Sequence, residues 1–132
     1  MNPTTKRILL VDDDDMLRSV LAQVLHRAGY FINTASDGRQ GLEIALAEDY
    51  DLVITDLIMP ETEGIELIQQ LRKVKPSIRI IAMSGGGRVS PENYLSLAKA
   101  LGATAVLSKP FLNEDILKAV HDALSEGGNP TT

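Results

Sequence analysis

The chain has 132 residues, with 13 basic against 18 acidic side chains and a formal net charge of −5. This length fits one domain with a core that needs no disulfides. The sequence has no cysteine, which excludes disulfide scaffolds, thiol catalysis and thiolate metal sites. The acidic balance disfavours neutralisation of a phosphate backbone, so we expect neither direct nucleic-acid binding nor docking on an anionic membrane.

The apolar runs and the N-terminal residues predict no membrane targeting. No apolar run approaches the ~18 residues of a transmembrane helix. The basic N-terminus leads into a short apolar run and then into four aspartates, which is unlike a signal peptide. We therefore expect a soluble, cytoplasmic protein with one domain over residues 1–132, a core at about 6–125 and a flexible tail at 126–132.

Two kinds of segment alternate along the chain. Short runs rich in Ile and Val predict strands buried on both faces, and apolar residues at helical spacing predict the helices between them. In chain order they are a strand at 8–11, a helical stripe at 17–25, a strand at 30–35, a stripe at 42–46, a strand at 51–55, a stripe at 65–71, a strand at 78–83, a stripe at 94–101, a strand at 103–107 and a stripe at 116–124.

Capping residues agree with these helices. Asp37, with Gln40 three residues later, predicts the start of the second helix, and Asn113 predicts the cap of the last. Gly29 and Gly102 follow the first and fourth helices in the usual C-terminal place. Five successive strand–helix units with right-handed crossovers predict an α/β fold, a doubly wound parallel sheet with helices on both faces.

Polar side chains follow several of the predicted strands, where ligands bind in open parallel sheets. The first strand runs into Asp12 and Asp13, the third ends in Asp56, the fourth reaches Ser84 and the fifth reaches Lys109. Clustered carboxylates repel one another unless a divalent cation or an amine relieves them. An all-oxygen ligand set favours Mg²⁺, and a metal and an ammonium beside a free carboxylate suit phosphoryl transfer to that carboxylate.

Four segments together resemble the receiver domain of bacterial two-component response regulators, over roughly residues 6–125. The segments are Leu10–Asp14, Ile54–Pro60 followed by Gly64, Ala82–Gly85, and Lys109–Phe111. Each segment alone is a weak signal, but all four in this order and spacing are specific. The resemblance implies a single-domain, CheY-like receiver with a flavodoxin-like (βα)5 fold and the strand order 2-1-3-4-5.

The resemblance also implies a role for each residue of the acidic cluster. Asp56 would be the phosphoacceptor and one of the Mg²⁺ ligands. Asp13 would bind Mg²⁺ directly, Asp12 would hold it largely through water, and the backbone carbonyl of Ile58 would be a further ligand.

Lys109 would pair with a phosphoryl oxygen, and Ser84 would donate its hydroxyl to the attached phosphoryl group. Pro110 would follow a cis peptide bond. The phosphoryl donor would be a sensor histidine kinase, a phosphotransfer protein or a small acyl phosphate. The domain would catalyse only its own phosphorylation and dephosphorylation, and phosphorylation would switch a surface that binds an unknown protein target.

Three features depart from the family pattern. Val106 stands where the family usually has an aromatic residue that reports phosphorylation. The segment from Ser84 to Lys109 is longer than usual and begins with three glycines, which predicts a loose loop. We expect no output domain, so that the fourth helix, fifth strand and fifth helix would form the binding surface.

Other interpretations remain open for the same residues. Asp12 and Asp14 resemble the Asp-x-Asp of Mg²⁺-dependent phosphatases of the haloacid-dehalogenase type, although Met16 does not fit that motif. A flavodoxin-like FMN carrier would need a hydroxyl-rich loop where this chain has aspartates. Asp14 and Asp15 also suit a solvated turn that opens a helix, and we expect His26 and His121 to be surface residues.

Overall fold

Five parallel strands form the centre of the structure, a computed structural model that describes residues 5–57, 63–84, 96 and 99–125. The strands are β1 (Arg7–Val11), β2 (Phe31–Ala35), β3 (Leu52–Asp56), β4 (Arg79–Ser84) and β5 (Ala105–Ser108). They lie in the order β2-β1-β3-β4-β5, and every neighbouring pair is parallel. The predicted parallel α/β sheet and its 2-1-3-4-5 order are therefore confirmed.

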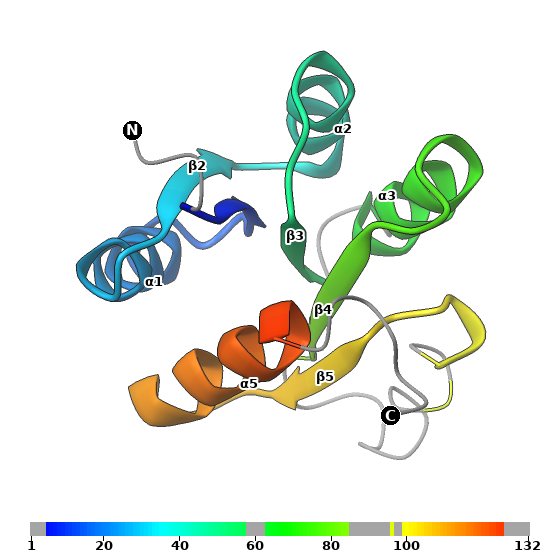
Figure 1. The fold of residues 1–132 in the computed structure, drawn as a ribbon. Coiled ribbons are helices and arrows are strands. Elements are labelled where there is room, and N and C mark those ends of the chain that lie inside the picture. The colour runs from blue at the N-terminus through cyan, green and yellow to red at the C-terminus, as the bar shows by residue number, and fades with distance from the viewer. Residues whose placement is uncertain (1–4, 58–62, 85–95, 97–98, 126–132) are drawn as a thin grey trace.

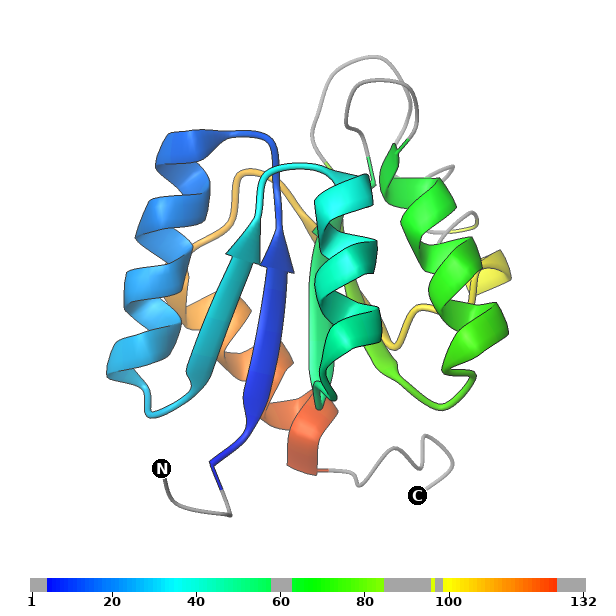
Figure 2. The same cartoon turned by 90° about the horizontal axis from the view of Figure 1, so that it is seen from above.

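Helices cover both faces of this sheet (Figures 1 and 2). They are α1 (Asp15–Arg27), α2 (Gly38–Ala47), α3 (Glu63–Val74) and α5 (Asn113–Ser125). In Figure 1, α1 and α5 lie on one side of the sheet and α2 and α3 on the other. Half of the predicted fourth helical stripe, residues 94, 95, 97 and 98, falls outside the described residues. Among the described helices, none has the length and apolar composition needed to span a membrane.

Each face of the sheet has its own hydrophobic core, because side chains alternate between the two faces along a strand. On one face, Leu9 and Val11 of β1 pack with residues of α2 and α3 such as Ala45 and Leu71. On the other face, side chains of α1 and α5 meet those of the central strands: Ile8, Leu10, Leu21, Leu25, Ile54, Ile81, Ile116 and Val120.

The prediction that all strands are buried on both faces holds only for the central ones. Along β1, β3 and β4 nearly every residue is buried, whereas β5 has no buried residue and β2 has one, Ala35. β2 and β5 are the edge strands, so each lacks a neighbour on one side. Two residues of the predicted helical stripes, Val20 and Leu46, are also 45% and 49% exposed, because they lie at the flank of the buried arc.

The capping residues of the helices lie where the sequence predicts them, with one exception at the start of α5. The side chain of Asp37 accepts the backbone N–H of Gln40 at 2.8 Å, as expected for the start of α2. The expectation that Asn113 caps α5 is wrong, because Asn113 is already the first helical residue. The N–H of the preceding residue, Leu112, instead donates to the carboxylate of Asp115 at 2.9 Å.

Gly29 and Gly102, which the sequence predicts directly after the first and fourth helices, adopt positive φ angles of 102° and 81°. At Gly102 the missing side chain also leaves room for Arg72 of α3, whose Nε would lie 3.1 Å from an added Cβ. The guanidinium of Arg72 donates to the backbone carbonyls of Pro76, Ile78 and Gly102. Arg72 therefore ties the end of α3 to the turn that leads into β5.

Candidate functional site

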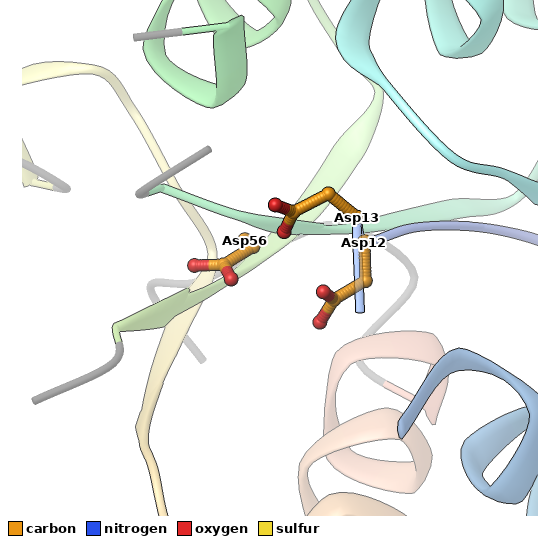
Figure 3. Close-up of side chains that lie close together, drawn as sticks. All are labelled: Asp12, Asp13 and Asp56. Carbon is orange, nitrogen blue, oxygen red and sulfur yellow. The ribbon is translucent and has the colours of Figure 1, made fainter. Parts of the chain in front are cut away.

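The carboxyl ends of β1 and β3 bring three aspartates together (Figure 3). Asp12 and Asp13 directly follow β1, and Asp56 is the last residue of β3. One carboxylate oxygen from each lies within 4.8 Å of the other two. Asp12 is 0% and Asp56 5% exposed, whereas Asp13 is exposed to solvent. The predicted acidic cluster is thus present, with one open side.

Lys109 reaches into this cluster from the end of β5. Its Nζ donates to Oδ2 of Asp56 at 2.8 Å and to Oδ2 of Asp12 at 3.0 Å. Burial by itself lowers the pKa of Lys109, but the hydrogen bonds and charges of Asp56 and Asp12 outweigh burial and raise its pKa above the ordinary value. The amine is therefore a permanent cation at neutral pH, and it balances one of three negative charges.

Backbone contacts fix the strand ends that carry these side chains. The hydroxyl of Thr55 donates to the carbonyl of Asp56 at 3.1 Å. The start of α3 packs so closely on this carbonyl that a Cβ at Gly64 would lie only 1.9 Å from its oxygen. Position 64 therefore requires glycine, because any side chain would displace the backbone of Asp56.

The end of β5 is held against the end of β4. The N–H of Lys109 donates to the carbonyl of Ser84 at 2.7 Å, and the peptide bond between Lys109 and Pro110 is cis, as the family resemblance implies. Ser84 is 5% exposed and follows Met83, the partner of Asp56 in the sheet. The sheet thus places Ser84, Lys109 and Asp56 at the same edge.

The three aspartates suit a small, hard cation. Carboxylate oxygens are the donors that Mg²⁺ prefers, and octahedral coordination at ~2.1 Å separates neighbouring ligand oxygens by about 3 Å and opposite ones by about 4 Å. Oxygens within 4.8 Å of one another reach that range with a small adjustment or a bridging water. The expected carbonyl ligand, Ile58, lies outside the described residues.

The remaining predicted residues fall as follows. His26 and His121 are exposed, as expected for surface histidines. Val106 is half-buried and packs against the core on the α3 side of the sheet. Asp14 caps α1, because its carboxylate accepts the N–H of Leu17 at 3.0 Å. The interpretation of Asp14 as part of a helix-opening turn is confirmed.

One contact at the site was missed by the sequence analysis. Arg18 of α1 donates from Nη1 to the backbone carbonyl of Asp12 at 2.7 Å and from Nη2 to Asp15 at 2.6 Å. The pairing with Asp15 is visible as an i,i+3 spacing of opposite charges. The contact with the backbone of Asp12 has no sequence signal, because it depends on how α1 turns back along β1.

Comparison with known proteins indicates the protein family in which this acidic cluster occurs. Residues 8–121 match the family described as the response regulator receiver domain. The chain belongs to that family. It is a receiver domain of two-component signalling, the class of protein that the four sequence segments resemble. The acidic cluster at the strand ends is the part of this fold that fits phosphorylation and metal binding.

Relatives of similar length support the assignment. The response regulator receiver protein CpdR of Brucella abortus (strain 2308) is 33% identical over 121 residues, which are 90% of this chain and 97% of that protein. Sporulation initiation phosphotransferase F of Bacillus subtilis (strain 168) is 34% identical over 115 residues, 87% of this chain and 90% of that protein.

A solved structure has the same fold. The chemotaxis protein CheY4 of Vibrio cholerae superimposes with a TM-score of 0.82 at 33% identity, over 92% of this chain and all of that one. Several other relatives are longer, and this chain spans only 25% to 29% of their length. The receiver domain is therefore shared with both short and long proteins.

Proposed function

We propose that Asp56 is the residue of this receiver domain that accepts a phosphoryl group. The observation that carries the proposal is the bridge from Lys109 to Asp56 and Asp12 within a cluster of three aspartates. Asp56 stands at the end of the central strand β3, is almost fully buried, and shares the open edge of the cluster with the exposed Asp13. An incoming phosphoryl group would enter by that side.

In the proposed reaction, an oxygen of Asp56 attacks the phosphorus of a phosphohistidine on a sensor kinase or phosphotransfer protein. The new O–P bond forms as the N–P bond breaks, and the imidazole leaves with the electron pair and takes a proton. The ammonium of Lys109 pairs with a phosphoryl oxygen and offsets the negative charge brought by the phosphoryl group. A small acyl phosphate would donate in the same way, with its carboxylate as the leaving group.

Asp12, Asp13 and Asp56 would hold Mg²⁺. When bound, Mg²⁺ supplies positive charge that stabilises the phosphoryl oxygens during transfer. Asp12 already has its Oδ1 fixed by the N–H of Asp14 at 2.9 Å and its Oδ2 fixed by Lys109. Asp13 has the more accessible carboxylate. This difference supports direct binding by Asp13 and contact largely through water by Asp12.

The switched surface would include the groove between β5 and α5. This groove has a volume of about 500 Å³ and is lined by apolar and charged residues, among them Leu107, Phe111 and Lys118. Ser84 would donate its hydroxyl to the attached phosphoryl group and transmit phosphorylation from the site. Val106 cannot swing as an aromatic residue does, so in this proposal Ser84 carries the signal to an unknown protein target.

The proposal describes a signalling domain that catalyses only its own phosphorylation and dephosphorylation. Because transcriptional regulators occur among the relatives, the absence of direct nucleic-acid binding stays a prediction. The cytoplasmic location and the single-domain organisation of residues 1–132 also stay predictions.

A phosphatase of the haloacid-dehalogenase type fits the site less well. Such an enzyme would use Asp12 as nucleophile and Asp14 as its partner. Asp12 is fully buried with both carboxylate oxygens bonded, and the carboxylate of Asp14 is engaged in capping α1. Neither side chain is placed for an incoming substrate.

Mapping the acyl phosphate tests the proposal directly. The protein is treated with acetyl phosphate and Mg²⁺, the acyl phosphate is reduced with borohydride, and mass spectrometry locates the resulting homoserine. We expect the label on Asp56 and none in the Asp56→Ala variant. A label on Asp12 would assign the chain to the phosphatase class. Beryllofluoride binding in the presence of Mg²⁺ should likewise depend on Asp56, and equal binding by Asp56→Ala would contradict the proposal.

A further inference from the structure

Arg18 connects α1 to the backbone at the end of β1. Its Nη1 donates to the carbonyl oxygen of Asp12 at 2.7 Å, and its Nη2 donates to Oδ1 of Asp15 at 2.6 Å. The side chain of Arg18 is only 19% exposed, whereas that of Asp15 is 86% exposed. A guanidinium that is largely buried against a strand end makes a stronger bond to a carbonyl than a neutral donor would.

The carbonyl that Arg18 contacts belongs to the peptide between Asp12 and Asp13. The side-chain oxygens of Asp12 are separately fixed, Oδ1 by the N–H of Asp14 and Oδ2 by Lys109. The N–H of Asp12 donates to the carbonyl of Ala35 on β2 at 3.2 Å. Rotation about the Cα–C bond of Asp12 would move the carbonyl that Arg18 holds and would carry the Cα and Cβ atoms of Asp13 with it, so the bond from Arg18 restrains the direction of the Asp13 side chain.

We propose that Arg18 is a positioning residue for the cation site: it locks the Asp12–Asp13 peptide so that the carboxylate of Asp13 faces Asp56. This inference rests on the proposed function, in which these aspartates hold Mg²⁺. Arg18 touches neither the cation nor the phosphoryl group. It acts through the backbone, as second-layer hydrogen bonds do around other metal sites.

An electrostatic role and a positioning role of Arg18 predict opposite changes in Mg²⁺ affinity when the side chain is neutralised. A positive side chain beside a cation site repels the cation, so a purely electrostatic role predicts tighter Mg²⁺ binding when Arg18 is neutralised. A positioning role predicts weaker binding, because Asp13 loses its fixed direction and must be ordered when the cation binds.

The test is calorimetric titration of the full chain with MgCl₂. For Arg18→Met we expect the Mg²⁺ dissociation constant to rise about tenfold, the lower end of the usual effect of losing such a contact. For Arg18→Lys, which keeps the charge and one donor, we expect a rise of about threefold. The matched control is Arg39→Met, because Arg39 is 89% exposed and pairs with Glu43 on α2 at 3.5 Å. It should leave the constant unchanged within about twofold.

A second readout needs no cation. In metal-free Arg18→Met, the ¹³C resonance of the Asp12 carbonyl should move upfield, because a charged hydrogen bond to it is lost. The same resonance should stay in place in Arg39→Met. A role of Arg18 limited to helix stability would not move this resonance while the protein remains folded.

Unchanged or tighter Mg²⁺ binding by Arg18→Met would overturn the inference. If that variant does not fold, Arg18→Lys decides alone, and an affinity equal to that of the wild type overturns it. Failure of the inference is distinguishable from failure of the proposed function through Asp13→Asn. Wild-type binding that Asp13→Asn abolishes and Arg18→Met does not weaken would refute only the positioning role. A wild-type chain that binds no Mg²⁺ would refute both.

Discussion

Replacing Asp56 by asparagine should stabilise the metal-free protein, although it removes an ion pair. At an effective dielectric constant of about 20, carboxylates no more than 4.8 Å apart repel by at least about 3.5 kcal/mol, so Asp12 and Asp13 together oppose the charge of Asp56 by about 7 kcal/mol. Lys109 at 2.8 Å attracts it by about 6 kcal/mol. The two effects nearly cancel, and burial of Asp56, which is 5% exposed, decides the sign.

Asparagine keeps an oxygen for Lys109 and removes the charge. We therefore expect Asp56→Asn to raise the free energy of unfolding by about 0.5–2 kcal/mol without Mg²⁺. Urea denaturation in EDTA, followed by far-UV circular dichroism, measures this change, and the slope with urea should stay constant. Added Mg²⁺ should reverse the order, because a cation at 100 times its dissociation constant stabilises the wild type by about 2.7 kcal/mol. The variant has one charged ligand fewer and should gain less.

The control is Asp49→Asn, which removes an exposed carboxylate that lies 3.3 Å from Lys75. It should change the stability by less than about 0.5 kcal/mol, with or without Mg²⁺. An Asp56→Asn variant no more stable than the wild type in EDTA would refute the reasoning, since Lys109 would then outweigh both the repulsion and the burial of the charge.

Three further predictions concern contacts outside the cluster of Asp12, Asp13 and Asp56. Gly64→Ala should lower the free energy of unfolding by about 2 kcal/mol or more and slow labelling of Asp56, because the new Cβ would lie 1.9 Å from the carbonyl of Asp56; wild-type stability would disprove the close approach. Arg72→Met should cost about 2–3 kcal/mol in urea denaturation, because three backbone carbonyls lose a charged donor; a neutral result would mean that water replaces it. Lys118 donates to Asp122 at 2.6 Å and, chiefly through this hydrogen bond, holds the pKa of Asp122 below its ordinary value of 3.8. The bond therefore stabilises the fold above pH 3.8 and is lost as the pH falls through the lowered pKa. Asp122→Asn should make the fall in melting temperature below about pH 4 less steep, and an equally steep fall would exclude this pair as a cause.

The sequence by itself determined the order of the elements and the residue types at the strand ends. Apolar runs and helical stripes report burial locally, so β1, β3 and β4 follow from them to within a residue or so. Because the carboxyl ends of parallel strands share an edge, the same runs predict that Asp12, Asp13, Asp56 and Lys109 lie close together. This reasoning misplaces the cap of α5 by one residue, because Leu112 uses Asp115 instead.

Only the tertiary structure decided which contacts complete the site. That Lys109 bridges two aspartates, that Gly64 sits against the carbonyl of Asp56, and that Arg18 holds the carbonyl of Asp12 all depend on how separate elements pack. Backbone carbonyls are present at every residue and leave no mark in the sequence. The chemistry of the site can therefore be predicted from the residue types, whereas contacts between side chains and backbone carbonyls are known only from the folded structure.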